Sequence, residues 1–245
     1  MTAPESSAVT WGGRRLPYAI RRSPRRKKTV AVTVDPGGSV LVVAPVRLAS
    51  ARLDEIVTRK APWIVRRLQR AASHGPPPAP REFVSGESVL YLGRHYRLKV
   101  HPDDTGAAGT AKLRGGWLHV PAPAGARQAA HVRAALVAWF RRHAAERLPE
   151  RVEAWRARAG VAPPRVVVAD QRKRWGSCDH HGTIRLNWRI VQAPMRLVDY
   201  VVVHELVHLR HRGHGRDYWQ AVGRVMPDYE RRREELRKCG SALAW

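Results

Sequence analysis

Short segments rich in valine and isoleucine, bounded by glycine and proline, dominate the first half of the chain and predict β-strands. The strands are expected at residues 17–22, 29–34, 39–44, 88–92, 95–100 and 117–120. Between the third and the fourth, apolar residues recur at helical spacing and predict a helix over residues 50–72. A Pro-rich run at residues 75–80 and a Gly-rich run at residues 105–109 predict loops. No internal sequence repeat is evident.

Helical spacing dominates the second half of the chain. Helices are expected at residues 128–159, from residue 194 onward, around residues 218–222 and at residues 228–238, with strands at residues 166–168 and 184–188. The pattern predicts an α+β fold in two parts. The first is a β-rich N-terminal region with one helix at residues 12–125, and the second is a mainly helical domain at residues 126–245.

One predicted helix carries His204, Glu205 and His208 directly after a run of three valines. Burying polar groups is costly unless they have partners. Two histidines four residues apart on a helix point the same way, about 40° apart around its axis, so that both can bind one metal ion. The pattern is the H-E-x-x-H arrangement of zinc metallopeptidases, in which the glutamate is the general base.

A catalytic zinc ion needs a third protein ligand and an open position for water. His214 is the expected third ligand, because the spacing of the three histidines matches the longer zincin signature H-E-x-x-H-x-x-G-x-x-H. That signature has glycine where this chain has His211, so His211 is a rival ligand. Glu230 and Glu234, on the last predicted helix, are the other rivals.

This ligand set predicts one zinc ion and a hydrolytic chemistry. Zinc lowers the pKa of bound water towards ~7 and polarises the scissile carbonyl. Glu205 would take the proton of that water and pass it to the leaving amine. The tetrahedral oxyanion needs a further donor, for which Tyr229 and His211 are candidates. Met226 is expected either beneath the metal or in the ordinary core.

The composition excludes several classes of protein. No apolar run has the length of a membrane span, and the N-terminus lacks the apolar stretch of a signal peptide. Cys178 and Cys239 are the only cysteines, which excludes a disulfide framework and a cysteine-based zinc finger. We therefore expect a cytoplasmic protein without membrane contact.

The formal net charge of +25 is unusual, and most of it comes from arginine. Basic clusters at residues 21–28, 172–174 and 231–233 would attract nucleic acid or another polyanion. Because the charges are spread along the whole chain, an arginine-rich composition on solvated surfaces explains them equally well. Nucleic acid is therefore a hypothetical partner.

Several further motifs stand in a defined order along the chain. They lie at residues 22–27, 44–45, 60–64, 91–96, 174–178, 182–188, 199–206, 218–219 and 226–229. Together with His214 they resemble the YgjP-like family of zinc metallopeptidases, which is related to the SprT-like proteases. The resemblance covers roughly residues 18–238 and implies a zinc-dependent peptidase, with a zincin-like catalytic domain at residues 126–245 that acts on a protein or peptide substrate.

The chain departs from the family beside its third histidine. Family members often have Asn-His-Ser where this chain has Gly213, His214 and Gly215. The histidine is kept, but its hydrogen-bonding neighbours differ, and such neighbours normally orient a metal ligand.

The motif at residues 174–178 is expected to form a tight turn close to the substrate cleft. The strand at residues 183–188 is a candidate edge along which a peptide substrate adds. Cys178 is expected to be a small buried thiol rather than a fourth ligand. Asp199 is expected to cap the metal-binding helix or to orient a ligand histidine.

Three functions are compatible with these patterns. The first is a zinc endopeptidase, the second is a protease that acts on nucleic-acid-bound proteins, and the third is a non-catalytic nucleic-acid-binding protein with structural zinc. Glu205 disfavours the third, because a structural site has no use for a base and is usually four-coordinate and cysteine-rich.

Overall fold

The computed structural model describes residues 5–35, 37–73, 81–103, 110–171 and 173–243, so both predicted loops, at residues 75–80 and 105–109, lie outside the described residues. The chain divides into two compact units, Met1–Ala79 and Pro80–Trp245. The division expected from the sequence, between residues 125 and 126, does not coincide with this one. The second group of predicted strands packs with the helices that follow it and belongs to their unit.

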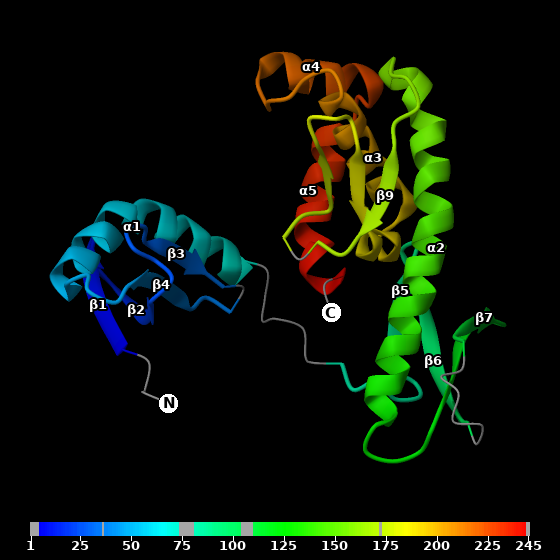
Figure 1. Cartoon of the computed structure of the whole chain (residues 1–245), viewed down its shortest axis with the longest axis horizontal. Helices are drawn as coiled ribbons and strands as arrows, with labels where there is room; N and C mark the ends of the chain where they lie inside the picture. The colour runs from blue at the N-terminus through cyan, green and yellow to red at the C-terminus, as the bar shows by residue number, and fades with distance from the viewer. Residues whose placement is uncertain (1–4, 36, 74–80, 104–109, 172, 244–245) are drawn as a thin grey trace. The chain divides into compact units, whose positions relative to one another are not determined.

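The first unit is a four-stranded sheet covered by one helix. Its elements are β1 (Glu5–Trp11), β2 (Arg14–Ser23), β3 (Ala31–Val34), β4 (Val40–Pro45) and α1 (Ser50–Ser73). The strand order is β1-β2-β4-β3, with β2 and β4 parallel and the other two pairs antiparallel. Alternate residues of the strands and one face of α1 form a separate apolar core. This follows from the repeat of two residues in a strand and of 3.6 residues in a helix. Figure 1 shows α1 lying across these strands.

The second unit begins with a sheet of the same topology, followed again by a helix. Its elements are β5 (Ser88–Tyr91), β6 (Arg94–Pro102), β7 (Lys112–Arg114), β8 (Trp117–Ala122) and α2 (Gln128–Ala159). The order is β5-β6-β8-β7, again with one parallel pair in the centre. The described part of the chain therefore contains an internal structural repeat that was not evident in the sequence.

The repeat extends to the burial pattern of the central strand. On β4, three alternate residues face the core, and three alternate residues of β8 do the same. They are Val40, Val42 and Ala44 in the first unit and Leu118, Val120 and Ala122 in the second. Apolar residues of similar type thus occupy equivalent positions of the two strands. The two repeats therefore share a burial pattern as well as a backbone pattern.

The hairpin that joins the first two strands differs between the repeats. In the second unit, the amides of Leu92 and Gly93 donate to the carbonyls of Val191 and Gln192 (2.8 and 3.1 Å). At the equivalent hairpin of the first unit, no described residue other than the chain neighbours of Gly13 has an atom within 4 Å of its Cβ position. The second repeat therefore supports the segment that leads into the helix of His204 and His208.

The rest of the second unit carries the candidate site. Its elements are β9 (Val166–Ala169), β10 (Gly176–Cys178), β11 (Ile184–Asn187), the 3-10 helix η1 (Trp188–Gln192), α3 (Met195–His208), α4 (Arg216–Val225), α5 (Tyr229–Cys239) and the 3-10 helix η2 (Gly240–Leu243). The strand order is β10-β11-β9. Helix α2 packs against both β8 and α3, so one helix connects the sheet of the repeat with the site; Figure 1 shows α2 running past β5, β6 and β9.

The α+β class expected from the sequence is confirmed. The strands β1, β7 and β10 were not predicted. The strand expected to be an open edge at residues 183–188 is wrong in that role, because β11 is the central strand, between β9 and β10. Across the described residues, no helix has both the length and the apolar character of a membrane span.

The role expected of Asp199 is also wrong. Helix α3 begins at Met195, so Asp199 is an interior residue and not a cap. Its carboxylate accepts a hydrogen bond from Nε of Arg151 on α2 (2.7 Å). This partly buried ion pair joins α2 to α3. Asp199 therefore does not orient a histidine.

Candidate metal centre and active site

Helix α3 brings the first two histidines of the motif together. It is buried over most of its length, because the residues before and between the polar ones are valine and leucine. One helical turn separates His204 from His208, so both imidazoles leave the same side of the helix. Their ring centroids lie 4.9 Å apart.

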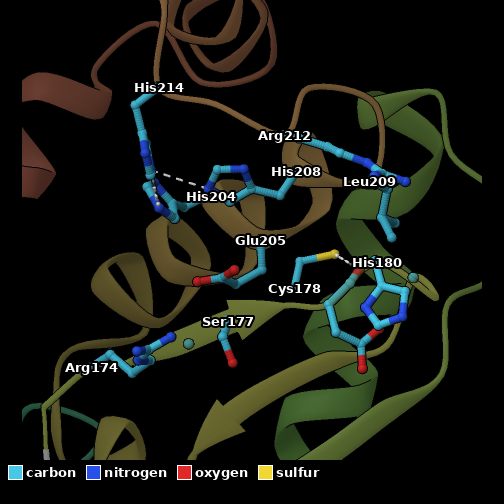
Figure 2. Close-up of a pocket in the computed structure, with 13 residues that line it drawn as sticks. Arg174, Ser177, Cys178, His180, His204, Glu205, His208, Leu209, Arg212 and His214 are labelled. Atoms are coloured by element: carbon cyan, nitrogen blue, oxygen red, sulfur yellow. Dashed lines mark hydrogen bonds between the residues drawn. The ribbon is translucent and has the colours of Figure 1, made fainter.

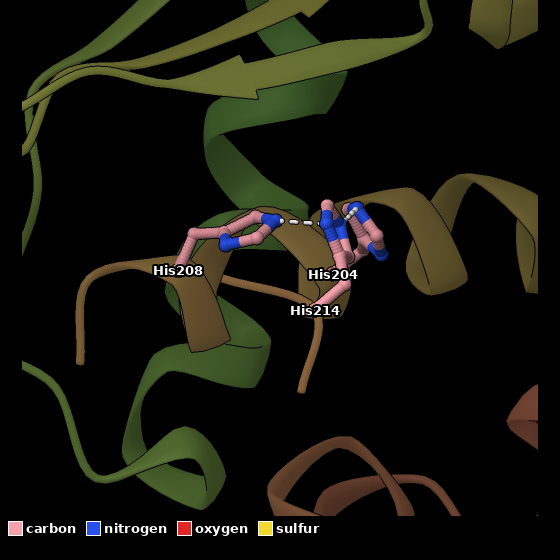
Figure 3. A group of neighbouring side chains, drawn as sticks. All are labelled: His204, His208 and His214. Carbon is pink, nitrogen blue, oxygen red and sulfur yellow. Dashed lines mark hydrogen bonds between the residues drawn. The ribbon is translucent and has the colours of Figure 1, made fainter. Parts of the chain in front are cut away.

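The third histidine reaches this pair from the segment between α3 and α4. Nε2 of His214 lies 3.1 Å from Nε2 of His208 and 3.2 Å from Nε2 of His204 (Figure 3). The candidate ligand atoms of the three residues all lie within 4.8 Å of one another. Nitrogens bound to one zinc ion at about 2.0–2.1 Å with tetrahedral angles would lie ~3.3 Å apart. The spacing of the imidazoles therefore fits one tetrahedral ion.

The rival ligands lie elsewhere. His211 lines a different hollow, on the side of Arg158 and Arg224. Glu230 is exposed and accepts from the hydroxyl of Tyr229 (3.2 Å), and Glu234 pairs with Arg237. Among the described residues, the three histidines are the one group with the number and spacing of side chains that a metal ion needs.

Two of the histidines, His204 and His208, are held in the neutral form that binds metals. Burial, together with the neighbouring His208 and His214, lowers the pKa of His204 to about 3. Burial also lowers the pKa of His208. Nδ1 of His208 donates to the carbonyl of His211 (2.9 Å), which leaves the Nε2 lone pair free to face the cluster. The donor set thus suits a divalent metal.

Two aromatic residues of α4 pack around the histidines. The Tyr218 hydroxyl donates to the carbonyl of His204 (3.1 Å), and its ring stacks on His208 with centroids 4.5 Å apart. Trp219 lies beside His204 and His214, with ring centroids at 6.0 and 5.8 Å. The sequence assigned neither residue a role at the site, although both belong to the motif at residues 218–219.

The carboxyl group of Glu205 lies between the histidines and strand β10 (Figure 2). The residue is 4% exposed. Burial raises the pKa of its carboxyl to about 8, and the positive charge of Arg174 acts in the opposite direction. A carboxyl with this pKa exchanges a proton readily near neutral pH, which suits a general base and acid.

Two hollows border the metal cluster and Glu205. One, of about 460 Å³, is lined by β10 and by the segment after α3, including Cys178, Arg212 and His214 (Figure 2). The other, of about 300 Å³, is lined by Trp175, Tyr200 and residues of α5. Arg174, Gly176, His204 and Glu205 border both. The motif at residues 174–178 therefore lies at the cleft, as expected from the sequence.

Other residues named from the sequence are placed as follows. Cys178 lines the larger hollow, and its thiol donates to the carbonyl of Asp179 (3.6 Å). Burial raises the pKa of this thiol, which disfavours the thiolate that a metal ligand needs. Met226 is buried in the apolar core, and the Tyr229 ring stacks on Trp219 (5.4 Å) without lining either hollow.

Comparisons with known proteins identify a metallopeptidase family for this chain. Residues 28–239 match the model of a family described as YgjP-like, metallopeptidase domain. Among solved structures, the chain is similar to the metallopeptidase zymogen of Pyrococcus abyssi abylysin at 20% identity, over 36% of this chain and 90% of that one, with a TM-score of 0.34. No curated protein matches the chain.

Proposed function

Because the chain belongs to the YgjP-like metallopeptidase family, we propose that it is a zinc-dependent peptidase that uses His204, His208 and His214 as zinc ligands and Glu205 as general base. The observation that carries the proposal is the meeting of three imidazole nitrogens beside one buried carboxyl group in an open hollow. Family membership makes the protein a metallopeptidase with a divalent metal and a protein or peptide substrate. The identity of the metal, the single ion and the residue roles are the proposal.

A zinc ion bound to these ligands would supply Lewis-acid chemistry, by polarising a carbonyl oxygen and making a water molecule more acidic. Glu205 accepts a proton from the attacking water, because its carboxylate faces the hollow next to the histidines. It then donates that proton to the leaving amine. Arg174 supports the first step, since its charge opposes the effect of burial and favours the ionised carboxylate.

Strand β10 is the proposed docking edge for the substrate. It pairs on one side with β11, and its residues Gly176, Ser177 and Cys178 line the larger hollow. An extended peptide that adds to a free strand edge gains main-chain hydrogen bonds without regard to its side chains. This placement runs the peptide past Glu205 and the histidines. It replaces the edge expected at residues 183–188.

The alternatives differ in what they require of Glu205. A non-catalytic protein with structural zinc has no reason to keep an ionisable group 4% exposed next to the ligands, since burial of a carboxylate is unfavourable. A protease directed to nucleic-acid-bound proteins would keep the same chemistry. It would differ by a nucleic-acid-binding surface outside the cleft.

The test compares the wild-type protein with Glu205→Gln and His214→Ala. We expect about one zinc ion per chain in the wild type and in Glu205→Gln, and a large loss of zinc in His214→Ala. Only the wild type should cleave casein or itself. Cleavage by Glu205→Gln at the wild-type rate would disprove the role of the base. Absence of zinc from the wild-type protein would disprove the proposed metal centre.

A further inference from the structure

Helix α1 carries an exposed tryptophan among basic residues. Trp63 is 39% exposed, although tryptophan usually buries most of its ring. Residues three and four positions away on either side of it share its face of the helix. These positions hold Arg59, Lys60, Arg66 and Arg67, and all four are exposed. We call these five residues the Trp63 patch.

The Trp63 patch has one acidic neighbour along the helix, Glu55, which lies four positions before Arg59 and pairs with Arg52 instead. After Glu55 the next acidic residue of the chain is Glu82, beyond the end of α1. Among the described residues, none of the four basic side chains forms an ion pair, whereas Arg52 near the start of the helix pairs with Glu55. The guanidinium of Arg67 lies 5.8 Å from the centroid of the Trp63 ring. The positive charge of the patch is therefore uncompensated.

The repeat supplies a comparison within the same chain. Helix α2 occupies the place of α1 in the second repeat and is also rich in arginine. Some of its surface arginines are paired, as Arg147 is with Glu150 and Arg156 with Glu153, whereas Arg133 and Arg142 form no ion pair with a described residue. Helix α2 also places a guanidinium over an aromatic ring, that of Arg158 over Trp155 (5.2 Å), but Trp155 is half-buried, whereas Trp63 is exposed. Among the described residues of these two helices, an exposed tryptophan flanked by four basic residues is found on α1 alone.

A second basic surface lies in the same unit. Residues 21–28 contain six arginines and lysines and line a hollow of about 860 Å³, together with Thr29 and Val43. Over residues 1–79 the chain has 15 arginines and lysines and four acidic residues. Positive charge alone attracts any polyanion. The exposed ring of Trp63 narrows the choice of polyanion to one that can also stack on an aromatic ring.

We propose that the Trp63 patch binds single-stranded nucleic acid. A base would stack on the exposed face of Trp63, and the surrounding arginines and lysine would contact the phosphates. Single-stranded nucleic acid is favoured over a duplex because the faces of paired bases are already stacked and unavailable. It is favoured over an acidic peptide for a second reason. The cations alone would bind the carboxylates of such a peptide, which has no flat ring on each residue to stack on Trp63. The proposal is independent of the peptidase chemistry.

The test measures binding of a fluorescent oligothymidylate to the full-length protein by fluorescence anisotropy over a series of salt concentrations. Trp63→Ala should weaken binding about tenfold or more, since stacking is lost, and Trp63→Phe should restore most of it. Arg66→Glu combined with Arg67→Glu should weaken binding and reduce the salt dependence, because fewer counterions are released. Two matched controls lie in the second unit. They are Trp117→Ala, at a tryptophan 38% exposed, and Arg133→Glu combined with Arg142→Glu, at exposed arginines of α2.

The proposal is overturned if Trp63→Ala binds as tightly as the wild type, or if the controls lose as much affinity as the matched variants. It is also overturned if polyglutamate displaces the oligothymidylate as efficiently, charge for charge, as unlabelled oligothymidylate does, since the patch would then recognise charge alone. Zinc content and casein cleavage are measured on the same variants and should not change. Failure of the nucleic-acid proposal is therefore distinguishable from failure of the proposed peptidase function.

Discussion

Gly176 of strand β10 lies directly against the carboxyl group of Glu205. A Cβ atom at residue 176 would lie 2.5 Å from Oε1 and 2.7 Å from Cγ of Glu205. These distances are shorter than any Cβ contact that a folded protein tolerates, so only glycine permits the present position of the carboxyl group. The contact joins the motif at residues 174–178 to the H-E-x-x-H helix and fixes the position of the candidate base, the Glu205 carboxyl group.

Gly176→Ala is expected to reduce peptide cleavage by about 100-fold, because a displacement of the base by an ångström is enough for such a loss. Zinc content should stay unchanged, since the atoms nearest to a Cβ at residue 176 belong to Glu205 and not to a histidine. The control is Gly213→Ala, at a glycine near His214 whose Cβ position has no atom within 4 Å. Equal activity of the two variants would show that the contact does not position Glu205.

The ligand set predicts a difference between two neighbouring histidines. His214→Ala should lower zinc affinity by several orders of magnitude, because a three-ligand site loses one of its ligands. His211→Ala and Glu230→Gln should keep the zinc, since neither side chain lies in the cluster. Zinc titration of the metal-free variants measures this. Zinc retained in His214→Ala but lost in His211→Ala would reverse the assignment.

Glu205 is expected to make the metal-free protein less stable as the pH rises. Burial raises the pKa of this carboxyl to about 8 in the folded state, whereas an unfolded glutamate has a pKa of about 4.3. Between these values the folded protein holds a proton that the unfolded chain has released, so the free energy of unfolding falls with increasing pH. Below the lower value both states are protonated and the effect disappears.

Urea unfolding of the zinc-free wild type and of Glu205→Gln measures this effect. Across that window, the stability of the wild type relative to the variant should fall by about 5 kcal/mol, since each pKa unit corresponds to about 1.4 kcal/mol. A constant difference between the two proteins from about pH 5 to about pH 8 would contradict the raised pKa.

The two repeats predict unequal effects of one substitution. Gly13 and Gly93 have similar positive φ angles of 73° and 78°, so alanine is strained at both, by about 1 kcal/mol. At Gly93, a Cβ would also lie 2.8 Å from Cα of Pro194, the residue directly before α3. We expect Gly93→Ala to cost roughly a further 1–3 kcal/mol.

Hydrogen exchange of each unit, followed by mass spectrometry, separates the two effects. Gly93→Ala should increase exchange in η1 and at the start of α3, because the hairpin can no longer approach Val191 and Gln192 closely. Gly13→Ala should affect the first unit alone. Equal destabilisation by both substitutions would show that the close approach to Pro194 has no energetic importance.

Family membership and the metal-binding pattern were predictable because both depend on short stretches of sequence. The positions of His204, Glu205 and His208 on one helix follow from helix geometry, which is local. The Trp63 patch is local in the same sense, since its five residues lie within about three turns of one helix. Apolar spacing likewise predicted α1 and α2 close to their observed bounds.

Strand pairing was not predictable in this way. Strand β10 has the sequence Gly-Ser-Cys, without apolar alternation, and becomes a strand because it pairs with β11. The strand expected at the edge became the central one for the same reason. The repeat of the two sheets also escaped detection, because strand order and register can be kept while most side chains change.

The sequence by itself determined the helices, the charge and the chemistry that the three histidines and Glu205 can perform, because each of these depends on residue type and short-range spacing. Only the tertiary structure decided what surrounds them. The packing of distant segments placed Gly176 against Glu205, Tyr218 against His208, and Arg151 on Asp199. Contacts of this kind depend on how separate elements pack, and no local periodicity of a chain encodes that arrangement.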